Sequence, residues 1–406
     1  MAKTICFDLR CLQMGHQSRG IGMHVRSILE HLPADPNVSY VFYVFDEYDP
    51  IEKLGIKINA PYSLIKTKTV KKSIDHPKDI AHLSRIIMHR FKPLQSSSPD
   101  VFIQFDLMLG LPKIAGTKTV LVAYDLIPLI YSQEYLPTPL QAFRSTPGKF
   151  LPFKKALRAA YYRGRYRLHY QNFRKADQII AISKHTAKSV EELLGVDSKK
   201  ITTIPLAPVF NTDRALMPKS MPDSSKPFLF YIGATDARKR VQDLVDAYNI
   251  LRGRGYDIHL VLAGKELGKV RKIPNSDIRH SIQQSPYGKD IVTLGYVNDQ
   301  EKLWLYQNAL AFVFPTLHEG FGLPVLEAMK NGCPVVSYDN SSIPEVSGSV
   351  ARLVPTRDIT AIVNEVAGIY DDATLQDELR KQGPRQALKY SWNAYIKSLF
   401  KAIQEK

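Results

Sequence analysis

Short apolar segments alternate with segments of helical spacing along this chain, and no other feature restricts its fold as strongly. In the first half the apolar segments are residues 4–9, 38–45, 101–105, 119–124 and 178–182. Their nearly continuous apolar character is typical of parallel strands that are buried on both faces. Helical spacing occurs at residues 22–32 and 184–194. The alternation predicts a doubly wound α/β sheet.

The same alternation starts again after a polar stretch at residues 211–227, which has no useful periodicity and contains three prolines. Strands are predicted at residues 228–232, 258–263, 291–294, 310–314 and 334–337, and helices at 240–252, 299–308 and 323–331. The sequence therefore predicts one domain at 1–210, a linker at 211–227, a second domain at 228–385 and a C-terminal helix at 386–406 that packs back on the first domain. Ligands of such folds bind beyond the carboxyl ends of the strands, here in a cleft between the two domains.

Composition places the chain among globular proteins, with 44% apolar and 23% charged residues. No apolar run reaches the length of a membrane span. A charged residue interrupts any apolar core of a secretory signal peptide near the first residue. The three cysteines are too few for a disulfide framework. We therefore expect a cytoplasmic protein.

The net charge of +16 is concentrated in a basic segment at residues 135–176, which contains no Asp or Glu. A smaller basic cluster comprises Lys66, Lys68, Lys71 and Lys72. Basic surfaces attract nucleic acid, anionic lipid or phosphorylated substrates. In the larger segment Phe153, Leu157, Tyr161, Gly164 and Leu168 form one stripe of a predicted amphipathic helix. We expect this stripe to contact the core and the basic face to be solvated.

Residues 314–329 carry two carboxylates around a glycine-rich turn. Gly320 and Gly322 permit a sharp bend after Glu319, and Pro324 suits the first turn of a helix that contains Glu327. The free N–H groups of a helix start bind phosphate readily. Carboxylates beside such a start indicate a ligand with a diphosphate and hydroxyl-bearing rings, as in a nucleotide sugar.

A second segment places three cations after a strand end. Gly233 opens a turn, and Arg238, Lys239 and Arg240 follow at the beginning of the next helix. Arg grips phosphate through two hydrogen bonds and Lys acts as a point charge. Because cations at a helix start oppose the helix dipole, this cluster favours a ligand role over a solvated surface. We expect the cations to neutralise a diphosphate leaving group.

Two further sites have weaker patterns. Gly20 and Gly22 lack the tight turn and third small residue of a dinucleotide fingerprint, since Val25 stands there, so we interpret residues 18–22 as a flexible loop facing the cleft. Asp125 follows a predicted strand and either caps the next turn or contacts a ligand. No Asp-x-Asp pair and no His/Cys cluster with metal-ligand spacing occurs in the sequence, so no metal is expected.

The Glu319-Gly320-Phe321-Gly322 motif with Glu327 resembles the hallmark of retaining glycosyltransferase family 4. This family has the GT-B fold, in which two doubly wound Rossmann-like domains face each other across a cleft. Further segments that fit the family are Arg238 and Lys239, Gly20 and Gly22, Gly264, residues 204–205, residues 294–297 and residues 342–346. By this resemblance residues 1–210 form the acceptor-side domain and residues 228–385 bind the nucleotide sugar.

The resemblance also implies individual roles. Glu327 would hold the ribose hydroxyls, Glu319 would contact the transferred sugar, and the amides of 320–323 would hold sugar and phosphate. The expected catalytic residues are Glu319, Arg238, Lys239 and Asp125. The expected donor-binding residues are Gly20, Gly22, Gly233, Gly264, Val297, Gly320, Phe321, Gly322, Leu323 and Glu327. The chain departs from the family at Tyr124, where many members have His, and at Ala234, where many have Arg.

The expected activity is metal-independent transfer of a hexose, with retention, to a glycan or lipid-linked acceptor in polysaccharide biosynthesis. UDP-glucose is favoured over GDP-mannose as donor, and neither a metal nor pyridoxal phosphate is expected as cofactor. Since polymer-building transferases often use lipid-linked acceptors, we expect peripheral contact with an anionic membrane at its inner face through residues 135–176, and no nucleic acid. The alternatives are a nucleic-acid-binding protein that uses this basic segment, a sugar-nucleotide epimerase and a phosphorylase.

Overall fold

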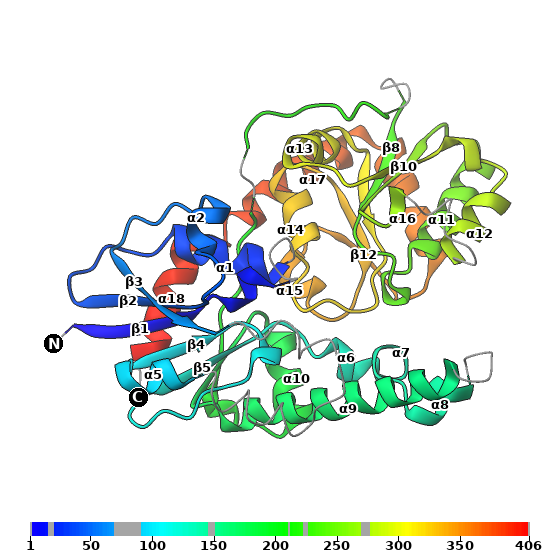
Figure 1. Cartoon of the computed structure of the whole chain (residues 1–406). Helices are drawn as coiled ribbons and strands as arrows, with labels where there is room; N and C mark the ends of the chain where they lie inside the picture. The colour runs from blue at the N-terminus through cyan, green and yellow to red at the C-terminus, as the bar shows by residue number, and fades with distance from the viewer. Residues whose placement is uncertain are drawn as a thin grey trace. The chain divides into compact units, whose positions relative to one another are not determined.

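The computed structural model describes residues 2–14, 20–68, 91–144, 151–209, 212–221, 226–268 and 277–404 (Figure 1). The chain divides into two compact units. Unit 1 comprises Met1–Leu206 with Trp392–Lys406, and unit 2 comprises Ala207–Ser391. Lys71 and Lys72 of the small basic cluster, Ser18, Arg19 and part of the predicted linker lie outside the described residues.

Unit 1 is built on a parallel sheet with the strand order β3-β2-β1-β4-β5-β6-β7. The strands are β1 (Lys3–Asp8), β2 (Val38–Phe45), β3 (Tyr62–Thr67), β4 (Val101–Gln104), β5 (Lys118–Ala123), β6 (Gln178–Ala181) and β7 (Ile201–Thr203). The register sets Lys3 opposite Val38 and Val120 opposite Gln178. The order runs outward from β1 in both directions, which is the doubly wound arrangement that the alternation predicts.

The helices of unit 1 include a C-terminal one that returns from the far end of the chain. They are α1 (Gly20–Glu30), α2 (Pro50–Leu54), α5 (Lys92–Ser97), α6 (Ile127–Ile130), α7 (Ser132–Tyr135), α8 (Pro139–Arg144), α9 (Leu151–Lys175), α10 (Lys184–Leu194) and α18 (Trp392–Gln404). Helix α18 is tied to β1, because Lys3 Nζ donates to the carbonyl of Ile403 at 3.1 Å. Its Trp392 ring lies 5.7 Å from the His24 ring of α1.

Unit 2 has a second parallel sheet, with the order β10-β9-β8-β11-β12-β13. The strands are β8 (Phe228–Ile232), β9 (His259–Ala263), β10 (Ile291–Gly295), β11 (Ala311–Phe314), β12 (Val335–Tyr338) and β13 (Arg352–Val354). The helices are α11 (Val241–Gly253), α12 (Asp277–Gln284), α13 (Asp299–Asn308), α14 (Leu323–Lys330), α15 (Ile343–Ser347), α16 (Ile359–Asp371) and α17 (Ala373–Ala387). The prediction of a doubly wound sheet is confirmed here as well.

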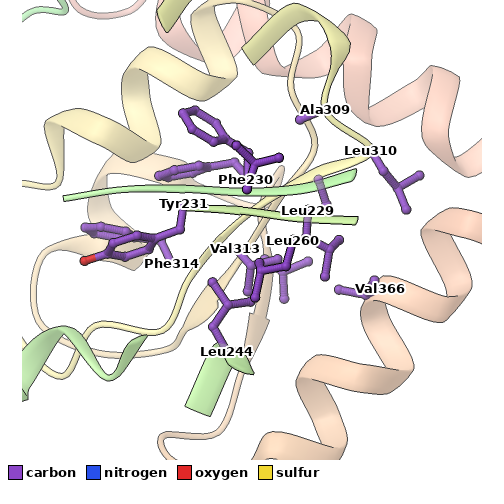
Figure 2. Close-up of a cluster of buried hydrophobic side chains, with 14 of the residues drawn as sticks. Leu229, Phe230, Tyr231, Leu244, Leu260, Ala309, Leu310, Val313, Phe314 and Val366 are labelled. Carbon is purple, nitrogen blue, oxygen red and sulfur yellow. The ribbon is translucent and has the colours of Figure 1, made fainter. Parts of the chain in front are cut away.

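The core of unit 2 fills the space between this sheet and its helices (Figure 2). Leu229 and Phe230 of β8, Leu260 of β9 and Val313 of β11 are wholly buried. Close packing of this kind holds the strand ends rigidly. The loops that leave β8 and β11 therefore start from fixed points, and these two loops carry the candidate site.

Two local predictions in unit 1 are wrong. Gly20 and Gly22 lie in the first turn of α1 and not in a flexible loop, because the helix begins at Gly20. On α9, the stripe expected to contact the core is exposed: Phe153 is 65%, Leu157 68% and Leu168 67% accessible. Within the described residues, no helix is both long and apolar enough to cross a membrane.

Candidate functional site

Glycine is required where the ends of β8, β9 and β10 meet. Gly264 has a φ of +149°, and a Cβ added there would lie 2.1 Å from the carbonyl oxygen of Gly233. Its amide donates to the carbonyl of Gly295 at 2.7 Å. Val297, just beyond this point, is buried. The three strand ends thus approach closely enough that only backbone fits between them.

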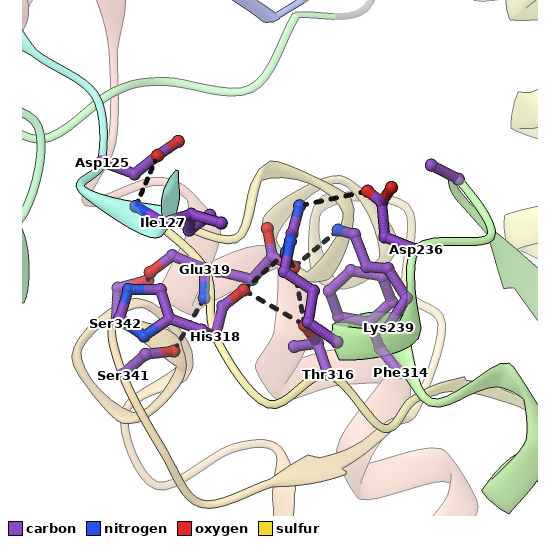
Figure 3. A network of polar contacts seen from close by, with 12 residues as sticks. Asp125, Ile127, Asp236, Lys239, Phe314, Thr316, His318, Glu319, Ser341 and Ser342 are labelled. Atoms are coloured by element: carbon purple, nitrogen blue, oxygen red, sulfur yellow. Dashed lines mark hydrogen bonds and ion pairs between the residues drawn. The ribbon is translucent and has the colours of Figure 1, made fainter. Parts of the chain in front are cut away.

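Two cations from the loop after β8 converge on one carboxylate from the loop after β11 (Figure 3). Arg238 Nη1 and Lys239 Nζ lie 2.9 and 2.5 Å from Oε1 of Glu319. Arg238 Nη1 also donates to the carbonyl of His318 at 2.6 Å, and the backbone of Leu317 donates to that of Arg238 at 2.7 Å. The structure therefore joins, through direct bonds, the three residues that the sequence analysis placed in two separate motifs.

Glu319 is held at its backbone as well as at its carboxylate. Thr316 Oγ1 donates to Oε1 at 2.7 Å, so this oxygen accepts from three donors. Ser341 Oγ accepts from the Glu319 amide at 3.0 Å, and Ser342 Oγ donates to its carbonyl at 3.0 Å. No donor among the described residues contacts Oε2. One oxygen is thus anchored and the other has no protein partner in that part of the chain.

Electrostatics keep Glu319 ionised although it is buried. Burial opposes the charge, but Lys239 and Arg238, with hydrogen bonds from Lys239 and Thr316, hold the pKa of Glu319 below its ordinary value. Burial also lowers the pKa of Lys239, and the negative charge of Glu319 partly offsets that effect. The Lys239 ammonium lies 4.7 Å from the centre of the Phe314 ring, a favourable cation–π distance.

The turn before α14 has the geometry that its glycines predict. Gly322 is the N-cap residue with a φ of +100°, and a Cβ there would lie 2.8 Å from Ile343 Cδ1. Leu323 begins the helix, and Pro324 stands in its first turn. Phe321 is buried and lies edge-on to Tyr390 at 5.8 Å. The residues expected to hold a phosphate therefore lie in a rigid strand-to-helix turn that follows directly on Glu319.

Glu327 has partners that the sequence analysis did not identify. Lys302 of α13 lies 3.2 Å from its Oε2, and the hydroxyl of Tyr306, one turn later, donates at 3.4 Å. Burial raises the pKa of Glu327, with Lys302 opposing the rise. An Asn298–Glu301 capping box fixes the start of α13 and is readable in the sequence. Pairing of α13 with α14 is not readable, because it depends on how two helices pack on one sheet.

Arg240, the third predicted phosphate cation, faces elsewhere. It caps α11 in the left-handed region with a φ of +48°, and its guanidinium binds Asp243 at 2.5 Å. Asp243 also accepts from the Tyr338 hydroxyl at 2.6 Å. The prediction that all three cations act together is therefore wrong for Arg240, and a phosphate role for Arg238 and Lys239 remains a prediction.

The remaining predicted residues belong to unit 1. Asp125 accepts from the backbone N–H of Ile127 at 3.0 Å, the bond of a local cap. The hydroxyl of Tyr124 lies 2.6 Å from His24 Nδ1, so this side chain is engaged within its own unit. Burial lowers the pKa of His24 to about 3, which makes the neutral imidazole the stable form. A ligand role for Asp125 remains a prediction.

Metal-ligating side chains do not gather in the described parts of either unit: no group of three or more His, Cys, Asp or Glu residues there could hold an ion. The positive charge available near Glu319 comes from Arg238, Lys239 and the amides at the start of α14.

Two doubly wound parallel sheets, each in its own unit, define the GT-B class of fold. The sequence profile described as Glycosyltransferase Family 4 matches residues 18–207, and that described as Glycosyl transferases group 1 matches residues 213–386. Together the two profiles span nearly the whole chain, and the chain belongs to glycosyltransferase family 4.

Several known proteins resemble the chain. It is 29% identical over 290 residues to the serotype-specific mannosyltransferase WbdA of Escherichia coli. The matched region covers 68% of this chain but only 32% of WbdA. It is 32% identical over 166 residues to the O-antigen chain mannosyltransferase B of E. coli, covering 41% and 42% of the two chains. The structure of Anabaena HepE in complex with UDP and glucose superposes with a TM-score of 0.66 at 13% identity, covering 100% of both chains.

Proposed function

We propose that the chain is a retaining hexosyltransferase that uses a nucleoside diphosphate sugar as donor. The observation that carries the proposal is the convergence of Arg238 and Lys239 on Glu319, directly before the start of α14. This arrangement joins two cations to an anchored carboxylate, and the start of α14 follows that carboxylate directly. A diphosphate and a sugar ring require these groups together.

The chemistry follows from the contacts. As the bond between the anomeric carbon and the diphosphate oxygen breaks, the acceptor hydroxyl oxygen bonds to the same carbon. Negative charge then grows on the departing diphosphate, and fixed cations and amides stabilise it without reorganising. Arg238 and Lys239 supply this positive potential, while the cations hold Glu319 through Oε1. The second oxygen, Oε2, is then oriented to accept hydrogen bonds from hydroxyls of the transferred sugar. Glu327 binds the ribose, and the departing phosphate accepts the proton of the acceptor hydroxyl.

The names of the relatives indicate which sugar the donor carries. Both E. coli relatives carry mannosyltransferase names, whereas the HepE structure was solved with UDP and glucose. Sequence similarity is higher for the mannosyltransferases, so we propose mannose as the first candidate and glucose, which the sequence analysis favoured, as the second. The acceptor is a growing glycan or lipid-linked oligosaccharide in polysaccharide synthesis on the cytoplasmic side of a membrane.

The proposal is tested by replacing Lys239 with Ala and measuring nucleotide release from the donor in the presence of acceptor. Loss of one such stabilising group lowers turnover by roughly 10²–10³-fold. Lys330→Ala is the matched control, because Lys330 is an exposed lysine at the end of α14 and should retain normal turnover. Near-normal turnover of Lys239→Ala would contradict the assignment.

Donor identity and reaction class are tested on the unmodified protein. Thermal-shift measurements with GDP-mannose and UDP-glucose report which nucleotide sugar stabilises the fold. Transfer should require acceptor, continue in the presence of EDTA and give a product with the anomeric configuration of the donor by NMR. Conversion of the nucleotide sugar without acceptor would instead indicate an epimerase.

A further inference from the structure

Helix α9 carries apolar side chains on two opposite faces. At 3.6 residues per turn, Phe153, Leu157 and Leu168 share one face, and Tyr170 and Phe173 lie on the other. The second face is the buried one and joins the core of unit 1. The first face is about two-thirds accessible, at 65%, 68% and 67% for its three residues. The helix therefore has one apolar face more than its own unit uses.

Helix α8 extends this exposed face. Its Leu140 and Phe143 are 57% and 40% accessible, and the Phe143 ring lies 5.3 Å from that of Phe153, edge to face. The two helices are neighbours in the fold (Figure 1). We name Leu140, Phe143, Phe153, Leu157 and Leu168 the α8–α9 apolar patch. Contiguous apolar surface on a globular protein commonly marks an interaction site.

The charged side chains of α8 and α9 in the described residues are all cationic, and the acidic residue nearest to the patch in the sequence is Glu134 of α7. Residues 135–176 contain no Asp or Glu. The exposed cations of α8 and α9 include Arg144, Lys154, Lys155, Arg158 and Arg167. Two helices that combine an exposed apolar strip with cationic side chains have the chemistry of a membrane-interface site, with apolar side chains in the hydrocarbon and cations at the headgroups.

We propose that the α8–α9 apolar patch docks on the surface of an anionic lipid bilayer. Two features favour a lipid bilayer over nucleic acid or a second copy of the chain. The patch includes three leucines, which insert well into hydrocarbon but do not stack on nucleic-acid bases as aromatic rings do. A second copy of the chain would bring like charges together across the contact, which is unfavourable. Docking concerns a surface of unit 1 and is independent of the sugar-transfer chemistry of unit 2.

The apolar part of the proposal is tested by vesicle flotation. The full chain should float with vesicles of phosphatidylcholine and phosphatidylglycerol at low salt. The double variant Leu157→Gln/Leu168→Gln should lower the partition coefficient by roughly tenfold or more, because two apolar side chains that would enter the bilayer are replaced by polar ones. The matched control is Leu193→Gln/Leu388→Gln, which changes two leucines that are 48% and 80% accessible outside the patch and should bind as the unmodified chain does.

The charge part is tested by salt and by a second pair of variants. Raising the salt concentration should release the protein from anionic vesicles. Arg158→Gln/Arg167→Gln should weaken binding and flatten this salt dependence, whereas Lys199→Gln/Lys381→Gln, at exposed lysines elsewhere, should have a smaller effect. Circular dichroism and thermal melting verify that each variant is folded.

Three outcomes would overturn the inference. The first is equal binding to neutral and anionic vesicles. The second is a concentration-dependent dimer in sedimentation that Leu157→Gln/Leu168→Gln abolishes. The third is RNA binding that is tighter than vesicle binding and depends on the same residues. Nucleotide-sugar binding is measured separately by thermal shift, so failure of membrane docking would leave the transferase proposal intact.

Discussion

Glu319 and Glu327 are both buried carboxylates of unit 2, yet their surroundings shift their pKa values in opposite directions. Oε1 of Glu319 accepts from Arg238, Lys239 and Thr316, and its pKa is lowered. Burial raises the pKa of Glu327, whose partners are one lysine at 3.2 Å and one tyrosine hydroxyl at 3.4 Å.

The comparison shows that burial alone does not decide the charge of a carboxylate. Burial penalises both anions, and the number and distance of the donors determine which effect is larger. The lowered pKa of Glu319 favours its anionic form, whose charge holds Arg238 and Lys239. Glu327 binds a proton more readily, because burial raises its pKa and fewer donors oppose that rise. The predictions below test this difference.

The largest expected effect comes from Glu319→Gln. This change leaves Lys239 buried without its counter-ion, and breaking one partner of a buried ion pair costs about 3–5 kcal/mol. The free energy of unfolding, measured with urea, should fall by that amount. Glu365→Gln is the control, because the Glu365–Arg352 pair is partly exposed and worth about 1 kcal/mol or less. Equal losses of unfolding free energy in Glu319→Gln and Glu365→Gln would show that the buried ion pair is worth no more than the exposed one.

A smaller effect is expected from Lys302→Met. Glu327 then loses its cation, but it can take up a proton, so the expected cost is about 1–3 kcal/mol in urea unfolding near pH 7. The double variant Lys302→Met/Glu327→Gln should recover most of this loss, since no unpaired charge remains. An additive double variant would show that Lys302 does not act through Glu327.

The smallest expected effect is on the pH dependence of the free energy of unfolding. Glu319 and Glu327 should contribute slopes of opposite sign. For Glu319 the unfolded chain binds the proton more tightly, so its contribution is present above the ordinary pKa of 4.5 and is lost as the pH falls through the lowered pKa. For Glu327 the folded chain binds the proton more tightly, so stability declines as the pH rises from 4.5 through the raised pKa.

These slopes are measured by urea unfolding between about pH 3 and 7, a range that spans the ordinary carboxyl pKa. Glu319→Gln should flatten the rise of stability with pH at the acid end, and Glu327→Gln should remove a decline above it. The same change of slope in both variants would mean that the two carboxylates have similar pKa values.

Much of the fold was predictable because buried parallel strands have a clear sequence pattern. The predicted bounds of β2 (Val38–Phe45) and β8 (Phe228–Ile232) agree with the structure. The edge strands β3 (Tyr62–Thr67), β7 (Ile201–Thr203) and β13 (Arg352–Val354) were missed. They are short or partly exposed, so their sequences lack the continuous apolar character of central strands.

The candidate site was predictable as motifs and not as contacts. The glycines around Glu319 are local requirements of backbone geometry and are visible in the sequence. That Arg238 and Lys239 bind Glu319 depends on where two loops meet, whereas Arg240 pairs with Asp243, three residues further along the chain. The exposed stripe of α9 shows the same limit, since the sequence has apolar residues on both faces and cannot say which face is buried.

The sequence by itself determined the two doubly wound sheets, the turn at Gly322 and the kinds of side chain near it, because periodicity and backbone sterics act over a few residues. Only the tertiary structure decided that Arg238 and Lys239 pair with Glu319, in which direction the pKa of each carboxylate shifts and which face of α9 is exposed. Those outcomes depend on distances between segments far apart in the chain, and such distances are set by packing.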